Sequence, residues 1–227
     1  MNFFNFKTKF LDMKNLEITS HSIVIVDNTF SNFVFEPNQQ VKLQIKNPFD
    51  PIANELFLKS RLNMEVVKMP NSDQIHREFL CGKDILIKYD FFPPRLHIQH
   101  NTSEDSREPK SLAKDLIEFA NLGSSVGAIG VNYEMFIQSD VVKVKEFLLK
   151  NDVAQEFSSL SAVLVLNISS ERVLNLRVAE AEVNGKAGIY CEANFHCTII
   201  EPSKINKILE EDFLTFAKNK IEAVFNK

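Results

Sequence analysis

Apolar and polar residues alternate along several short segments in the first hundred residues of this 227-residue chain. A period of two places successive side chains on opposite faces of a β-strand, so these segments predict strands with one covered face. Antiparallel sheets commonly have such a face. The predicted strands cover 41–45, 62–66, 75–81, 85–91 and 96–98. Cys81-Gly82-Lys83-Asp84 predicts a hairpin turn, and Pro93-Pro94 interrupts the ladder because proline cannot donate to it.

The second half mixes helical and strand periods. Apolar residues recur at helical spacing after Ser111 and again from Pro202 onward, and Asp140 can cap a short helix between them. Strands are expected at 131–137, 160–168, 172–182 and 187–199. The sequence therefore predicts an α+β protein with a mostly antiparallel sheet, a strand-rich N-terminal half and an αβαβββα C-terminal half.

The longest wholly polar stretch is NTSEDSREPK, from Asn101 to Lys110. A segment without apolar side chains buries too little surface to offset its ordering entropy, so this stretch predicts a linker or loop. The expected division is a β-rich half at 1–100, the polar segment at 101–110, and an α+β half at 111–227.

The stretch YCEANFHC, residues 190–197, resembles a metal or thiol site in composition. Asn184-Gly185 before it predicts a two-residue hairpin, in which the numbers of opposed residues sum to 369. Cys191 and Cys197 then point into the core, whereas Glu192 and His196 point to the other face. The four side chains cannot converge on one tetrahedral ion, so neither a metal site nor a catalytic thiol is expected here.

Two other segments carry candidate chemistry. Gly123 to Gly130 holds three glycines, but it leaves a helix and enters a strand, whereas a phosphate-binding loop enters a helix N-terminus. A helix cap and tight link is therefore predicted. Arg95, His97 and Gln99 share the polar side of one strand, which predicts either a solvated face or a small ligand surface.

Composition restricts the class of protein. The formal net charge of -4 gives no nucleic-acid footprint, and no segment has the length of apolar residues that a membrane span needs. Three cysteines, Cys81, Cys191 and Cys197, fit reduced thiols better than a disulfide framework. The sequence thus predicts a cytoplasmic protein that needs neither a cofactor nor a metal and that associates with a protein partner or with itself.

Part of the N-terminal half resembles a known family. The succession VFEPNQQVKLQI, the strand at Leu62 to Val66 and EFLCG at Glu78 to Gly82 are similar to the strands of the SecB family of protein-export chaperones. The pattern departs from that family after Pro93-Pro94, where another strand follows. The resemblance implies a small antiparallel sheet that binds extended or unfolded chains along its grooves.

Three functions remain open from the sequence. The first is a non-enzymatic interaction or assembly protein, an adaptor or complex subunit, and the second is a SecB-like chaperone that binds extended apolar segments. The third is an enzyme whose site assembles from distant residues: His97, His100, His196, Arg177 and Glu192. The candidate binding residues lie on the polar face of the predicted hairpin: Arg177, Glu192, Asn194 and His196.

Overall fold

The structure is a computed structural model that describes residues 13–27, 64–68, 76–81, 85–91, 94–100, 107–119, 126–139, 161–199 and 201–225. Its strands are β1 (Leu16–Asp27), β2 (Met64–Lys68), β3 (His76–Cys81), β4 (Ile85–Phe91), β5 (Pro94–His100), β6 (Val126–Gln138), β7 (Ser161–Ser169), β8 (Arg172–Val183) and β9 (Lys186–Thr198). Its helices are the short 3-10 turn η1 (Met13–Asn15) and the α-helices α2 (Arg107–Phe119), α5 (Lys204–Glu210) and α6 (Phe213–Phe225). The predicted α+β class with a mostly antiparallel sheet is confirmed.

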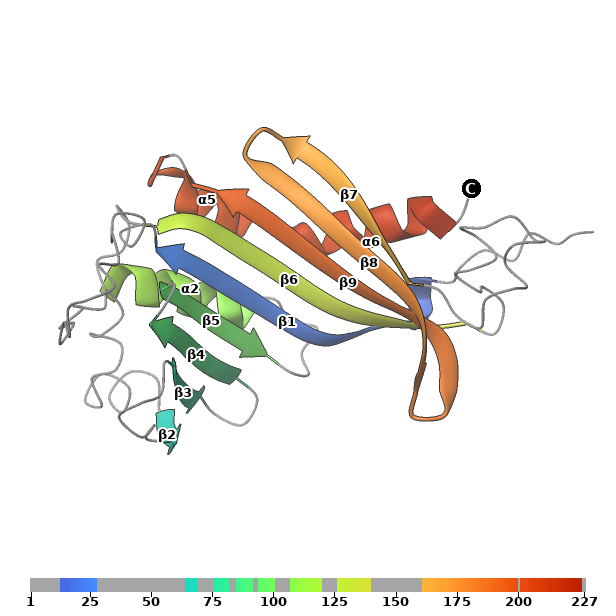
Figure 1. Cartoon of the computed structure of the whole chain (residues 1–227), viewed down its shortest axis with the longest axis horizontal. Coiled ribbons are helices and arrows are strands. Elements are labelled where there is room, and N and C mark those ends of the chain that lie inside the picture. Colours follow the sequence, from blue (N-terminus) through green and yellow to red (C-terminus); the bar gives the residue numbers. More distant parts are fainter. Residues whose placement is uncertain are drawn as a thin grey trace, which may run out of the picture.

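All nine strands form one sheet in the order β2-β3-β4-β5-β1-β6-β9-β8-β7 (Figure 1). The order is nearly symmetric about the centre of the sheet. Going outward from the centre, β1 is followed by β5, β4 and β3 on one side, and β6 is followed by β9, β8 and β7 on the other; only β2 has no counterpart. In the first half β1 is followed along the chain by the meander β2-β3-β4-β5 and then by α2, and in the second half β6 is followed by the meander β7-β8-β9 and then by α5 and α6. The two halves meet where β1 pairs antiparallel with β6.

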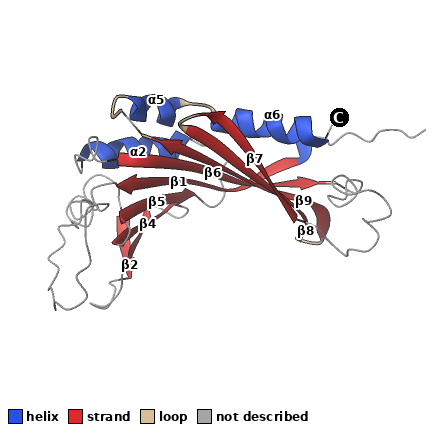
Figure 2. Ribbon diagram, turned by 45° about the horizontal axis from the view of Figure 1, so that its top comes forward, coloured by secondary structure: helices blue, strands red, loops and turns tan. Residues whose placement is uncertain are grey.

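The helices α2, α5 and α6 lie on one face of the sheet (Figure 2). Strand residues of one parity point to that face and are buried, as in Ile23, Val131 and Phe195. The helices contribute the other side of the core, with Leu116 and Ile221 fully buried. Full burial of an aliphatic or aromatic side chain stabilises a fold by about 1.5–3 kcal/mol, so this single interface holds the helices on the sheet.

The β8–β9 hairpin has the predicted register. Val178 pairs with Cys191, Arg177 with Glu192, and Val183 with Lys186 beside the turn. Asn184 and Gly185 both have positive φ, at 53° and 75°. Those two angles are what a tight hairpin turn demands, and the Asn-Gly pair adopts them at low cost. The turn therefore fixes which side chains of β9 enter the core.

The apolar spacing from Pro202 onward predicts one long helix, but the structure has two helices there, α5 and α6. The segment is interrupted after Glu210, because Glu211 is extended (φ -66°, ψ 144°). The Asp212 side chain then accepts a 3.0 Å hydrogen bond from the Thr215 N–H, which caps the start of α6. Glu211 and Asp212 therefore do not belong to a continuous solvated helix face.

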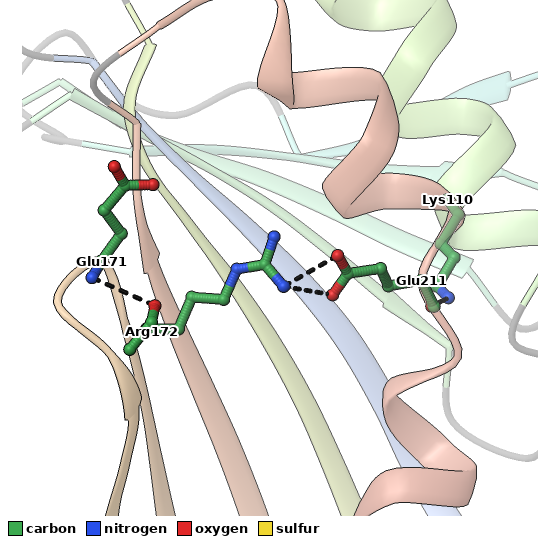
Figure 3. Close-up of polar contacts among 5 residues, drawn as sticks. Lys110, Glu171, Arg172 and Glu211 are labelled. Carbon is green, nitrogen blue, oxygen red and sulfur yellow. Dashed lines mark hydrogen bonds and ion pairs between the residues drawn. The ribbon is translucent and has the colours of Figure 1, made fainter.

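The interruption between α5 and α6 forms a polar clamp with the sheet (Figure 3). The Arg172 guanidinium, at the start of β8, donates to both carboxylate oxygens of Glu211 at 2.6 and 2.7 Å. Lys110 of α2 donates to the backbone carbonyl of Glu211. Lys204 of α5 donates to both carboxylate oxygens of Glu171 at 3.0 Å. Ion pairs and hydrogen bonds thus join the ends of α2 and α5 to the β7–β8 turn region.

Several expectations from the sequence end differently. The strand β1 was missed, and Gly127 and Gly130 belong to the strand β6. Residues 107–110 of the polar stretch form the first turn of α2, while the separability of the two halves stays a prediction. The strand at 41–45 and the helix after Asp140 lie outside the described residues.

None of the described helices has the length and apolar character that crossing a membrane requires.

Candidate functional site

The sheet carries a depression of about 440 Å³ on the face opposite the described helices. Its lining comes from the two central strands, β1 and β6, and from their outer neighbours, β5 and β9. Side chains of the parity opposite to the core residues form it, so the same alternation that builds the core also builds this surface. We call this depression the groove.

The size of the side chains explains why the sheet is hollowed there. The central strands contribute the small residues Ser20, Ser22 and Gly130, together with Val24, Val26, Asn132 and Glu134. The flanking strands contribute longer ones, with Arg95 on β5 and Glu192 on β9. The small side chains of Ser20, Ser22 and Gly130 lower the sheet surface between the longer side chains of the flanking strands.

Gly130 is not required there by packing. A Cβ at this position would meet the Val24 Cβ at 3.5 Å and two polar atoms at 3.9 Å, which are ordinary contacts. Glycine in a strand interior costs stability, and it often marks a place where a ligand approaches the backbone. The glycine therefore keeps the groove floor open without any steric need of the fold.

Polar groups are arranged along the groove in successive rows. In the first row, His97, Val24, Gly130 and His196 are neighbours across four strands. The next row holds amides and hydroxyls, where Asn132 donates to the Ser22 hydroxyl at 3.1 Å and pairs with Asn194. The third row is acidic, because Glu134 lies directly opposite Glu192. Imidazole groups thus lie towards one end of the groove and carboxylates towards the other.

The acidic row of Glu134 and Glu192 interacts with two neighbouring residues, Arg177 and Tyr190. Arg177 of β8 lies 3.9 Å from the Glu192 carboxylate, and both side chains are substantially exposed. Partial burial, together with the charges of Glu134 and Glu192, raises the pKa of the Tyr190 phenol to about 12. The negative potential of the two glutamates is therefore only partly balanced by Arg177.

The candidate residues chosen from the sequence come together in part. Glu192, Asn194 and His196 line one wall of the groove, as the hairpin register predicts. Arg177 borders it through Glu192. Arg95 and His97 supply the opposite wall, so the two polar strand faces of the sequence analysis belong to one depression.

Sequence reasoning missed the floor and centre of the groove. Ser20 and Ser22 lie on the unrecognised strand β1. Asn132 and Glu134 lie on a recognised strand, and their outward position follows from the inward alternation of Val131 and Tyr133. The missing information was the order of strands, which places β1 and β6 between β5 and β9.

The set of residues proposed for an enzyme does not assemble completely. His100 is buried on the helix side of the sheet, where it pairs with His21, and so it faces away from His97 and His196. His21 is also buried there, with its ring stacked on Tyr133 at a centroid distance of 4.6 Å. These four histidines therefore separate into a groove pair, His97 and His196, and a core pair, His21 and His100.

The two cysteines of β9 are core residues. Burial raises the pKa of the Cys191 thiol to about 12 and that of the Cys197 thiol to about 11. Thiolate is the reactive form of cysteine, so both side chains have little nucleophilic character at neutral pH. Among the residues that the structure describes, no three His, Cys, Asp or Glu side chains gather closely enough to hold a metal ion.

We expect Cys191 and Cys197 to react with a thiol reagent at least a hundredfold more slowly in the folded protein than in denaturant, because both thiols are buried and protonated. The measurement is the rate of absorbance change with a disulfide reagent in a Cys81→Ser background, which isolates the two thiols. Equal rates with and without denaturant would contradict the buried placement.

Comparisons with protein-family models and with curated proteins give no match for this chain. The geometry of the groove is therefore the basis for assigning a function.

Proposed function

We propose that this is a non-enzymatic interaction protein that binds a segment of a partner polypeptide in the groove. The observation that carries the proposal is the polar, small-floored groove along the four central strands. The lining positions of β9 recur at every second residue from Glu192 to His196, an interval that an extended ligand strand repeats because it has the same rise of about 3.3 Å per residue.

The distribution of polar groups favours binding over catalysis. His196 and Glu192 are four residues apart on β9, which corresponds to about 13 Å. Catalytic acid–base pairs must reach one reacting centre, within hydrogen-bond distance of it. Groups spread along a groove instead suit several separate contacts with a long ligand, as in an adaptor or complex subunit.

A chaperone that binds extended apolar segments is the second candidate. The edge strand β7 favours it, because Val163, Val165 and Leu166 are 59%, 63% and 38% exposed. A sheet edge can accept a further strand through backbone hydrogen bonds. This candidate predicts suppression of aggregation of unrelated unfolded clients, lost in Val163→Lys and Val165→Lys variants.

The proposal also includes two expectations from the sequence, one on the order of elements in the second half and one on the cellular compartment. A helix follows Asp140, so the second half has the order αβαβββ before its C-terminal helices α5 and α6. The protein acts in the cytoplasm, where a reducing environment suits the free thiols of Cys191 and Cys197.

The test is capture of the partner from the native host with groove variants. Arg177→Ala combined with Asn194→Ala and His196→Ala is expected to reduce capture at least tenfold, while the melting temperature changes by less than about 3 °C, because an exposed ion pair contributes at most about 1 kcal/mol. Lys186→Ala, in the same hairpin but outside the groove, is the matched control. Equal capture by the groove variant and the wild type would exclude the groove as the binding surface.

A further inference from the structure

The two ends of the groove differ in charge, with one guanidinium and two imidazole groups at one end and two carboxylates at the other. At one end the walls hold Arg95, His97 and His196, with Lys88 of β4 directly opposite His97. At the other end, Glu134 and Glu192 are directly opposed on neighbouring strands. Directly opposed like charges destabilise a pair of strands, so the fold retains an unfavourable arrangement at the acidic end.

A bound cation would relieve the repulsion between Glu134 and Glu192. Arg177 reaches Glu192 only at 3.9 Å and from an exposed position, and the hydrogen bond between Tyr190 and Glu134 brings no positive charge, so neither contact neutralises the pair of carboxylates closely. Because both glutamates line the groove, a ligand lying in the groove places that group between them.

The opposite end suits an anion. The Cα atoms of His97 and His196 are separated by three strand spacings, or about 14 Å, across Val24 and Gly130. His97 and Arg95 line this end of the groove from β5 and His196 lines it from β9, while Gly130 leaves the floor open between them. A carboxylate lying over Gly130 would accept hydrogen bonds from either wall.

We propose that the groove selects an extended peptide segment with an acidic and a basic side chain four positions apart, the acidic one over Gly130 and the basic one between Glu134 and Glu192. This inference rests on the proposed function and names the ligand chemistry of the same site. The separation of His196 and Glu192 along β9 sets the spacing of the two charges in the ligand. These residues are four positions apart, and an extended ligand that lies along β9 repeats that interval.

The same charges argue against a nucleic acid in the groove. A polyanion that satisfies Arg95 and the histidines would also place phosphates against Glu134 and Glu192. The formal net charge of -4 adds long-range repulsion. A peptide with two charges of opposite sign avoids this conflict.

The middle row supports a peptide backbone. Asn132 and Asn194 form neighbouring amides between the charged ends, with the Ser22 hydroxyl beside them. Amide side chains both donate and accept, and they therefore match the alternating N–H and C=O groups of an extended backbone. The ligand is thus bound through its backbone in the centre and selected by its charges at the ends.

Fluorescence anisotropy with short labelled peptides and the full chain tests the proposal. The dipolar probes have a glutamate and a lysine four positions apart in a serine and threonine background, in both chain directions. The controls replace the two charges by two glutamines or by two glutamates. One of the dipolar probes is expected to bind about tenfold more tightly than the diglutamine probe, and the diglutamate probe no more tightly than the diglutamine probe.

A charge reversal makes the test specific. In Glu192→Lys the acidic end holds one carboxylate and one ammonium group. The diglutamate probe is therefore expected to bind about tenfold more tightly than it binds the wild type, and the dipolar probe about tenfold more weakly. Lys186→Glu, outside the groove, is the control and should leave all probes unchanged. Equal binding of all probes, no binding of any probe, or tighter binding of a single-stranded oligonucleotide would overturn the inference. The proposed function has a separate test: it is wrong if the Arg177, Asn194 and His196 variants capture their partner as well as the wild type does.

Discussion

Replacing Gly188 with alanine is expected to lower the free energy of unfolding by about 3 kcal/mol, the upper end of the usual cost of overpacking a core. Gly188 is buried on β9, between β6 and β8. A Cβ there would overlap the backbone carbonyl oxygen of Ile137 and would lie 2.6 Å from the Cζ atom of Phe136. The ring can shift, but the carbonyl belongs to the β6–β9 ladder and cannot move without breaking it. Chemical denaturation measures the change.

Gly130→Ala is the matched control for this substitution. Both glycines lie in paired strands of the same sheet, but the nearest atom to a Cβ at Gly130 is 3.5 Å away. The control should change the free energy of unfolding by less than about 1 kcal/mol, because alanine also reduces the entropy of the unfolded chain. If the two variants were equally stable, the close packing at Gly188 would be incorrect.

The second large effect is acid destabilisation through His21. Burial, with smaller contributions from the charges of Lys110 and His100, lowers the pKa of His21 from 6.5 to about 4. The unfolded chain therefore binds a proton at a higher pH than the folded one. The contribution of neutral His21 is complete above pH 6.5 and is lost as the pH falls towards 4. The shift corresponds to about 2 kcal/mol lost at pH 5 and about 3 kcal/mol at pH 4.

Denaturation curves at pH 7.5 and pH 5 measure this loss, and His21→Phe separates it from other groups. Phenylalanine preserves the flat stacking on Tyr133 and removes the titration. We expect the variant to lose about 2 kcal/mol less than the wild type between the two pH values. His196→Ala, which alters an exposed histidine of the same sheet, should keep the acid sensitivity. An identical loss in wild type and His21→Phe would disprove the assignment.

Local signals in the sequence predict some elements fully. Asn184-Gly185 sets the turn, and from the turn follow the register of β8 with β9 and the burial of Cys191. Every step in that inference depends on residues near one another along the chain. The polar wall of β9 is therefore readable without any knowledge of the fold.

Other features depend on distant residues and could not be predicted. In β1 a register shift between Ile18 and Ser20 changes the side of the sheet to which later residues point. This bulge breaks the alternation, so the strand does not have a simple period of two. Glu211 has the sequence context of a solvated helix, and only its contact with Arg172 gives it another role.

The symmetric order of strands bears on the direction in which a ligand could lie in the groove. A sheet made of two identical halves would have a two-fold axis between β1 and β6, and the two ends of its groove would be the same. Such a surface would accept a peptide equally well in either direction. Here, the halves belong to one chain and have different side chains, with His97 and Arg95 towards one end and Glu134 and Glu192 towards the other. Under the proposed function, the groove therefore distinguishes the two directions in which a given charged segment could lie.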